Sequence, residues 1–533
     1  MGVYDSSPPP FFTSVPKFVR GIFIRMPSRR LFLQSLAASS AFAALPKHFS
    51  LPLLVSQSQL AADPLRPQIH LLPARNWMND PDGPIYWRGR YHMFFQYNPH
   101  AAVWGDMHWA HAVSPDMLRW QHLPVALSPT PNGPDADGCF TGSAVTHGGA
   151  ATLLYTGVKT VAPSEATIRD GRNNFLETQC LAVSRDSELR VWQKHKTPVL
   201  RPPHDPNLTG FRDPFLWREK NLWYMGVGSG LRGAGGRILL YRSPDLINWK
   251  ALPPLAQGEP TGLTTPDPVD AGDMWECPDF FALDGKHILL YSTQRKVIWE
   301  VGQYDPAEHR FHSQKRGLLD HGAFYAPKSQ LDAHDRRILW GWITEKRPEA
   351  EYSAAGWAGC MSLPRVLSVN VDGELTVRVI DETSSLNLEG FSWIMNYAAT
   401  DAQRASIREL ALNPAPLKLN LAASQKPFHL ALTDGQSPVL SFIFDPAQAG
   451  RELQLNSSAV PLPPRKSGDH HFTVFYDASV IECFADNTLA LTARVYHSPQ
   501  SKLRLSVSDP DLNALYSLSL ATLRPISPDR LTT

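Results

Sequence analysis

Three short motifs hold the residues of this chain that could do chemistry. They are WMNDPDG at residues 77–83, FRDP at 211–214 and WECPD at 275–279, and each sets a carboxylate close to a proline. Asp80, Asp213 and Glu276 lie far apart in the sequence, so they can share a site only if the fold brings equivalent positions together. Convergent carboxylates are what the cleavage of an acetal, such as a glycosidic bond, requires.

A repeated pattern of strands follows these motifs and indicates how they could converge. Five stretches share a polar or acidic opening, an apolar strand, an aromatic strand, a third strand and a closing polar turn. Four of them close on an aromatic residue, at intervals of 57 to 72 residues: Trp120, Trp192, Trp249 and Phe311. Four-stranded units of this length are typical of propeller blades. We therefore predict a five-bladed β-propeller over residues 63–378.

The propeller would place the three acids in one funnel. The first strand of each blade lines the central channel, and Asp80, Asp213 and Glu276 lie near the starts of repeats one, three and four. Packing like charges together raises their pKa values and costs free energy, which a fold tolerates mainly where the chemistry needs it. The pattern thus predicts a catalytic site rather than a structural cluster.

The remainder of the chain changes character. Short strand-like runs with mainly alternating apolar and polar residues lie at 417–421, 428–432, 440–444, 472–476 and 503–507. Period-2 runs separated by turn residues are typical of a β-sandwich. We predict an all-β protein, with a linker at residues 379–388 and a C-terminal β-sandwich at 389–533.

The N-terminus resembles an export signal of the twin-arginine type. Arg29 and Arg30 precede an apolar, alanine-rich run at residues 36–45. This run is too short for a membrane span, which needs about 20 apolar residues. Cleavage could fall at residues 41–43 or near Ala62. We predict that residues 1–62 form an N-terminal extension and signal peptide, and that the protein is periplasmic or extracellular with no membrane span in its mature form.

Composition limits the possible partners and cofactors. The chain of 533 residues has a net charge of +1 and only 19% charged residues, so no basic field exists to bind nucleic acid. Its five cysteines include no C-x-x-C pair, which favours buried free thiols, although one disulfide is conceivable after export. His100, His108 and His111 lack a matching carboxylate spacing for a metal site. We expect no metal and no cofactor; the oligomeric state stays open.

These motifs together resemble glycoside hydrolase family 32, the β-fructofuranosidases. The resemblance covers about residues 67–533 and rests on the NDPDG box, RDP and EC in this order. Family-like segments are also found at residues 140–143 (FTGS), 324–326 (FYA), 340–342 (WGW) and 477–484 (DASVIECF). Asp82 departs from the family pattern, which often has asparagine there.

The resemblance implies a retaining hydrolase for terminal β-D-fructofuranosides of sucrose, inulin or levan. Asp80 would be the nucleophile that forms a covalent fructosyl-enzyme, and Glu276 would be the general acid and base. Asp213 would bind fructose hydroxyls and stabilise the oxocarbenium-like transition state. The predicted substrate-binding residues are Asn79, Gln96, Trp104, Phe140, Ser143, Arg212 and Trp299.

Two other interpretations remain open from the sequence. The first is another five-bladed glycosidase, acting on arabinan or xylan, or a fructosyltransferase. The second is a sugar-binding propeller without catalysis, although a pure binder has no use for three converging acids. The preferred fructan and the choice between endo and exo cleavage are not determined by the sequence.

Overall fold

The computed structural model describes most of the chain beyond residue 54. The described residues are 55–169, 173–395, 411–413, 415–435, 437–465, 468–497, 499, 501–508, 514–528 and 530–531. The twin-arginine segment lies outside them. Helix α1 (Gln57–Ala62) begins at Ser56, whose side chain forms a capping box with Gln59. Its Leu60 is fully buried with Leu72 and Trp357. No helix among the described residues is long and apolar enough to cross a bilayer.

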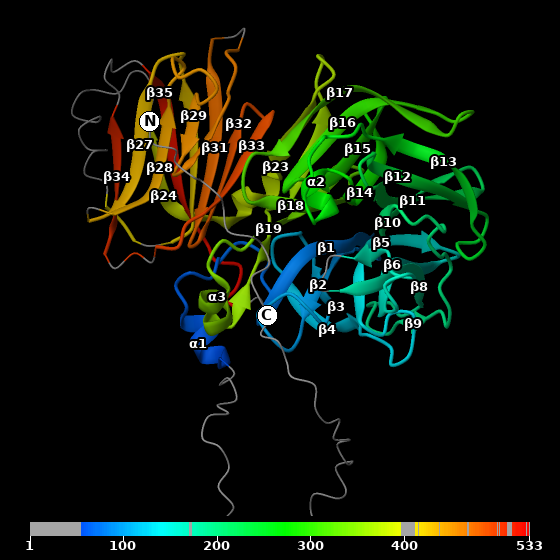
Figure 1. Ribbon diagram of the computed structural model, residues 1–533. Helices are drawn as coiled ribbons and strands as arrows, with labels where there is room; N and C mark the ends of the chain where they lie inside the picture. The colour runs from blue at the N-terminus through cyan, green and yellow to red at the C-terminus, as the bar shows by residue number, and fades with distance from the viewer. Residues whose placement is uncertain are drawn as a thin grey trace, which may run out of the picture. The chain divides into compact units, whose positions relative to one another are not determined.

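Five sheets between residues 76 and 379 form the propeller blades (Figure 1). Neighbouring strands in each sheet are antiparallel, except that β20 runs parallel to β1. Sheet 1 contains β1 (Asn76–Trp87), β2 (Arg90–Asn98), β3 (His108–Ser114), β4 (Gln121–Leu127) and β20 (Trp357–Ala358). Sheet 2 contains β5 (Gly138–His147), β6 (Ala150–Thr160), β8 (Asn174–Ser184) and the short β7 (Ile168–Arg169) and β9 (Gln193–Lys194).

Sheets 3, 4 and 5 repeat this arrangement. Sheet 3 contains β10 (Leu208–Glu219), β11 (Leu222–Leu231), β12 (Gly235–Ser243) and β13 (Lys250–Gln257). Sheet 4 follows the short helix α2 (Pro268–Ala271) and contains β14 (Glu276–Leu283), β15 (Lys286–Thr293), β16 (Lys296–Asp305) and β17 (Arg310–Asp320). Sheet 5 contains β18 (Phe324–Leu331), β19 (Arg337–Ile343), β21 (Cys360–Met361), β22 (Arg365–Val369) and β23 (Leu375–Val379), with α3 (Glu349–Ala355) inserted after β19.

The first strands of the five sheets contact one another in the cyclic order β1, β5, β10, β14, β18 and back to β1. Positions near the starts of these strands therefore face a common centre, as the repeat predicted. The closing turns are also equivalent, since the indole N–H of Trp120, Trp192 and Trp249 each donates to the carbonyl three residues earlier. The five-bladed propeller predicted from the sequence is confirmed.

Two six-stranded sheets form the C-terminal sandwich, which begins after the 3₁₀ turn η1 (Asp381–Leu386). Their inward apolar residues make one continuous core. The strand orders are β24-β35-β26-β31-β32-β33 and β25-β34-β27-β28-β29-β30. The bounds are β24 (Asn387–Met395), β25 (Ala411–Leu412), β26 (Leu417–Ala423), β27 (Phe428–Asp434), β28 (Ser437–Phe444), β29 (Leu453–Leu455), β30 (Ser458–Val460), β31 (His470–Asp477), β32 (Val480–Ala485), β33 (Leu489–Arg494), β34 (Leu503–Ser508) and β35 (Leu515–Leu523).

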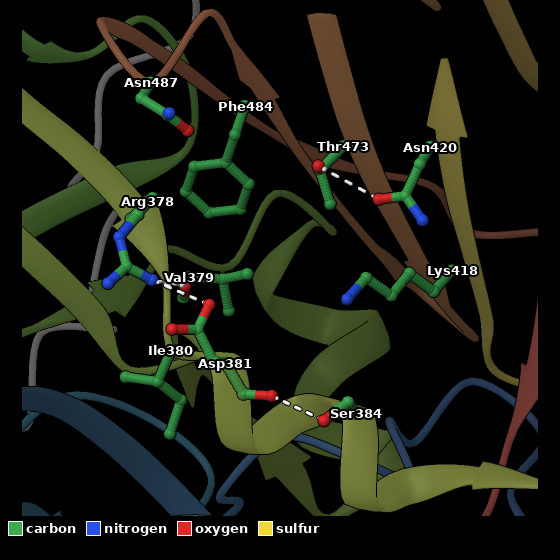
Figure 2. A pocket seen from close by; sticks show the side chains of 10 residues that line it. All are labelled: Arg378, Val379, Ile380, Asp381, Ser384, Lys418, Asn420, Thr473, Phe484 and Asn487. Carbon is green, nitrogen blue, oxygen red and sulfur yellow. Dashed lines mark hydrogen bonds and ion pairs between the residues drawn. The ribbon is translucent and has the colours of Figure 1, made fainter. Parts of the chain in front are cut away.

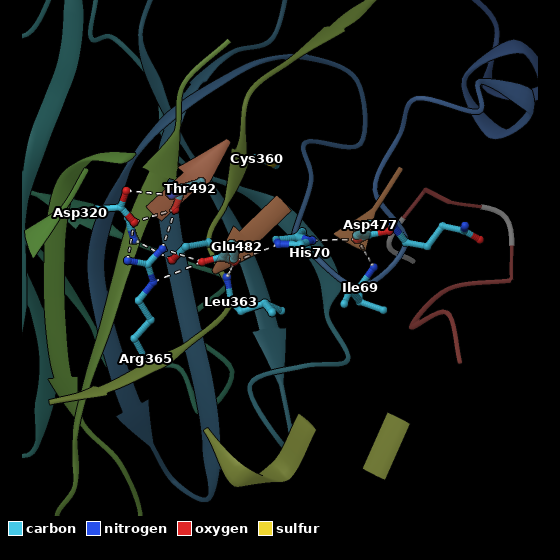
Figure 3. Close-up of polar contacts among 12 residues, drawn as sticks. Ile69, His70, Asp320, Cys360, Leu363, Arg365, Asp477, Glu482 and Thr492 are labelled. Atoms are coloured by element: carbon cyan, nitrogen blue, oxygen red, sulfur yellow. Dashed lines mark hydrogen bonds and ion pairs between the residues drawn. The ribbon is translucent and has the colours of Figure 1, made fainter. Parts of the chain in front are cut away.

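A buried polar network joins the propeller to the sandwich (Figure 3). His70, just before β1, lies between Asp477 and Glu482 of the sandwich, at 2.7 and 3.0 Å. Arg365 of β22 donates to Glu482 and to Asp320, at 2.6 and 2.9 Å. All these side chains are fully buried. Buried charges must be paired, so this network specifies how the two domains dock.

A cavity of about 380 Å³ lies between the end of the propeller chain and the sandwich (Figure 2). Its lining includes Arg378, Asp381, Lys418, Asn420 and Phe484. Two of these lining residues, Arg378 and Asp381, form an ion pair at 2.8 Å. The three motif acids lie on other strands and do not line this cavity.

Candidate active site

Each of the five first strands breaks its register at the same place. The shifts fall between residues 78 and 81 in β1, 140 and 142 in β5, 212 and 215 in β10, 276 and 279 in β14, and 325 and 328 in β18. Proline follows in four of the five strands, because a residue without an N–H is tolerated at a bulge. Asp213, Cys277 and Ala326 take positive φ values of 63°, 46° and 52°. Such bulges re-aim side chains, and here they turn the motif residues toward the centre.

Cys277 lies between two of the three acids. Its Sγ is 3.3 Å from Oδ2 of Asp80 and 3.5 Å from Oδ2 of Asp213, and its backbone N–H donates to the same Asp213 oxygen at 2.8 Å. Thr141 of β5 donates its hydroxyl to Asp80 Oδ2 at 2.7 Å, and Asn79 donates to Asp80 Oδ1 at 3.0 Å. These donors hold the Asp80 carboxylate in one orientation.

Glu276 is held from both sides. Arg212 donates Nε and Nη2 to its Oε1, at 3.1 and 2.7 Å, and Tyr325 of β18 donates its hydroxyl to Oε2 at 2.7 Å. The side chain of Glu276 is 22% exposed and that of Arg212 is 12% exposed. The five first strands thus each supply at least one polar residue to a single cluster, whose central members are Asp80, Thr141, Asp213, Glu276 and Tyr325.

Electrostatics in this cluster follow from burial and like charge. Burial raises the pKa of Asp80, against the hydrogen bonds from Thr141 and Asn79, and the Glu276 charge raises it further. Burial also raises the pKa of Asp213 to about 7, although the adjacent arginine opposes the shift. The carboxylates therefore share their site at a cost, which matches the expectation for a catalytic centre.

Asp82 adds a fourth acid beside this cluster. It is fully buried on β1, and Gln96 donates to its Oδ2 at 2.8 Å. Its Oδ1 has no hydrogen-bond partner among the described residues. Burial and then the nearby Asp80 charge raise the pKa of Asp82 well above its ordinary value. A protonated Asp82 has nearly the shape of the asparagine that the family often carries there.

The predicted substrate-binding residues fall into two groups. Asn79 and Arg212 contact the acids directly, and Trp104 (40% exposed) packs against Phe140, with ring centroids 5.8 Å apart. The other group has structural contacts. Gln96 bonds to Asp82 and the Cys139 carbonyl, Ser143 donates to the Pro214 carbonyl, and Trp299 packs on the propeller core while donating to the Leu318 carbonyl.

Four residues that contact the three acids or Arg212 were absent from the predicted site: Thr141, Tyr325, Cys277 and Glu177, whose Oε1 accepts from Arg212 Nη1 at 2.9 Å. Thr141 and Tyr325 belong to family-like segments already noted, so the signal for them was present. Cys277 lies inside the WECPD motif, and all five cysteines are free and buried, as predicted. Glu177 had only a weak signal, a single acid within a buried stretch of β8.

Comparison with known proteins assigns the chain to a family. Residues 70–378 match the model for the glycosyl hydrolases family 32 N-terminal domain, and residues 422–519 match that for its C-terminal domain. The chain belongs to glycosyl hydrolases family 32. It is therefore a glycoside hydrolase, and the resemblance predicted from the motifs is confirmed.

Relatives and solved structures agree with this assignment. The family 32 chain is 34% identical to sucrose-6-phosphate hydrolase of Escherichia coli, over 82% of this chain and 90% of that protein. It is 35% identical to fructan 1-exohydrolase of Triticum urartu, over 61% and 55% respectively. The structure of GH32 beta-fructofuranosidase from Bombyx mori is 28% identical, with a TM-score of 0.71, and covers 89% of this chain and 97% of that one.

Proposed function

We propose that this family 32 hydrolase cleaves terminal β-D-fructofuranosidic bonds of sucrose or fructans, with retention of configuration. The observation that carries the proposal is the single cluster of Asp80, Asp213 and Glu276, built from the first strands of three blades. Relatives described as sucrose-6-phosphate hydrolase, raffinose invertase and fructan 1-exohydrolase support this substrate class. So does the structure of a mutant Bombyx mori relative in complex with sucrose.

In the first step, Asp80 would attack the anomeric carbon of the fructosyl unit. Hydrogen bonds from Thr141, Asn79 and Cys277 orient its carboxylate. The side chain therefore loses little conformational entropy when one of its oxygens approaches the carbon. Glu276 would donate its proton to the leaving oxygen. The bond to the aglycone breaks as the ester to Asp80 forms.

In the second step, Glu276 would take a proton from water, and the resulting hydroxide would release fructose from Asp80. Asp213 is buried (3% exposed) beside both groups, where its charge would stabilise the oxocarbenium-like transition state. Two displacements at one carbon restore the original configuration. Water is the expected acceptor, and a second sugar could replace it at high concentration.

Product analysis tests this function. Purified protein should release fructose from sucrose, inulin or levan, and the first product seen by NMR should be the β-anomer. Asp80→Asn and Glu276→Gln should each lower kcat on the order of 10⁴-fold, with circular dichroism unchanged. With an activated fructoside, Glu276→Gln should accumulate protein that is heavier by one fructosyl unit. Turnover at the wild-type rate in either variant would contradict the assignment.

We also propose that the protein is exported through its twin-arginine segment. Arg29 and Arg30 before the apolar run support this. Replacing both by lysine should leave the full-length precursor in the cytoplasm of the producing cell. Fractionation followed by mass spectrometry of the N-terminus would locate the cut, and a precursor that is still exported would refute the proposal.

A further inference from the structure

Glu177 is a buried acid close to the site that the mechanism above does not use. It lies on β8, the third strand of sheet 2, and its side chain is fully buried. Its Oε1 accepts from Arg212 Nη1 at 2.9 Å, and its Oε2 accepts from the Phe211 backbone N–H at 2.7 Å. Both carboxylate oxygens are therefore used on the residues that precede Asp213.

Arg212 lies between two carboxylates. One edge of its guanidinium binds Glu177, while Nε and Nη2 bind a single oxygen of Glu276. Burial opposes the charge on Arg212, but the two carboxylates outweigh it and raise its pKa, so the guanidinium stays charged. Glu177 and Arg212 together form a neutral pair that faces Glu276.

This sharing matters because Glu276 has to hold a proton to act as the acid. A guanidinium close to a carboxylate favours the ionised form, by about 1–3 pKa units in general. If Glu276 were the sole carboxylate on Arg212, it would give up its proton more readily. A second carboxylate on the opposite edge reduces that attraction, since its charge opposes the arginine charge.

We propose that Glu177 is a positioning residue for the hydrolase reaction: it fixes Arg212 against Glu276 and offsets enough of the arginine charge for Glu276 to remain a proton donor. The inference rests on the proposed role of Glu276. Phe211 and Arg212 directly precede Asp213, so the same contacts also set the bulge that aims Asp213.

The other groups that face Glu276 are acidic or neutral, apart from Arg212. The acidic ones, Asp80, Asp213 and Asp267, repel a charge on Glu276 and so act in the same direction as Glu177, whereas Tyr325 and Cys277 are neutral. The charged and titratable groups around Glu276 are Arg212 and Asp213 on β10, Asp80 on β1, Tyr325 on β18, Cys277 on β14 and Asp267 before α2. Among these groups Arg212 is the cation, so the partner of Arg212 decides how strongly it acts on Glu276.

The test is the pH dependence of kcat/KM for sucrose in Glu177→Gln. Glutamine has nearly the shape of glutamate and keeps one oxygen that can accept from the Phe211 backbone N–H. It removes the negative charge that Glu177 places beside Arg212. The alkaline limb of the profile, which reports the ionisation of the essential acid, should move about one unit toward acid. At pH values well above that limb, kcat/KM should be about tenfold below wild type. A fructosyl fluoride, whose leaving group needs no proton, should not show this shift.

Two controls separate this effect from a general loss of structure. Glu300→Gln makes the same change at another buried glutamate, which accepts from Tyr291 in sheet 4, and it should leave the alkaline limb in place. Glu177→Asp keeps the charge and should also keep the wild-type limb. If Glu177→Gln does not fold, Glu177→Asn can be compared with Glu177→Asp, since these two variants differ in charge but not in side-chain length. The alkaline limb of kcat/KM should then lie about one pH unit lower in Glu177→Asn than in Glu177→Asp.

The outcomes are distinguishable. An acid-shifted limb in Glu177→Gln, together with an inactive Glu276→Gln, supports both the inference and the proposed function. An unshifted limb with an inactive Glu276→Gln overturns the inference and leaves the proposed function intact. Full activity in Glu276→Gln overturns both, because Glu177 would then have no acid to assist.

Discussion

The His70 contacts between propeller and sandwich predict a specific loss of stability at alkaline pH. Its two ring nitrogens face carboxylate oxygens of Asp477 and Glu482, and all three side chains are fully buried. A carboxylate can only accept, so both nitrogens donate and the ring carries a charge. Burial opposes this charge, but the two carboxylates outweigh it and raise the pKa of His70 from 6.5 to about 9.

The size of the effect follows from this shift. The folded protein binds the proton more tightly than the unfolded chain, so the added stability is fully present below pH 6.5 and is lost as pH rises through about 9. A difference of this size corresponds to about 3 kcal/mol. With an unfolding entropy on the order of 1 kcal/mol per kelvin for a chain of this length, the change in Tm is about 3 °C.

The perturbation is His70→Gln, measured by calorimetry between pH 6 and 10. At pH 6 the variant should be less stable than wild type by about 3–5 kcal/mol, because two buried carboxylates lose their cation. Between pH 6.5 and 9.5 the difference in Tm should shrink by about 3 °C, as wild type loses the same proton. Separate transitions for the two domains would be consistent with a weakened junction.

His92→Gln is the matched control. His92 is also buried, but burial lowers its pKa to about 4, so it carries no charge in this range. The Tm difference between this variant and wild type should not change between pH 6.5 and 9.5. A constant difference for His70→Gln over the same range would refute the charged junction.

Four further predictions concern the site and its surroundings. Asp82→Asn should stabilise the protein at pH 7 but not at pH 3.5. Burial raises the pKa of Asp82 in the folded state, so the aspartate lowers the free energy of unfolding once pH rises above the pKa of the unfolded chain. Equal effects at both pH values in denaturant titrations would contradict this. Asp213→Asn should lower kcat by about 10²-fold or more with little change in KM, measured by fructose release. Trp104→Ala should raise KM for sucrose several-fold and leave kcat nearly unchanged, since the exposed ring would bind ground and transition states alike; an unchanged KM would exclude it from the site. A chain starting at residue 64 should melt about 2–5 °C below one starting at residue 55, because it loses the buried Leu60, and equal Tm values would exclude a stabilising role for α1.

Much of the site could be predicted because its determinants are local. Proline after Asp80, Asp213 and Cys277 cannot donate to a strand ladder, so each motif predicts an interruption at the start of a strand. The strands that follow end on aromatic residues at intervals of 57 to 72 residues, and this repeat predicts equivalent positions in different blades. The three acids follow from these two observations without any knowledge of distant contacts.

The same reasoning was less informative for side chains whose role depends on their neighbours. Trp299 was predicted to stack on sugar, yet its ring packs on the propeller core, and Ser143 donates to a carbonyl of the next blade. An aromatic or hydroxyl residue suits either role, and the sequence contains no local feature that separates them. Their roles toward substrate stay predictions.

Local residue order by itself determined the blades, the sandwich strands and the three motif acids, because strand periodicity and proline geometry act over a few residues. Only the tertiary structure decided which groups surround those acids. Glu177 lies 35 residues from Arg212 in the chain, and His70 lies 407 residues from Asp477. Such pairs form because separate sheets pack against each other, and a charge in a low-dielectric interior acts on whatever the packing brings within a few ångströms.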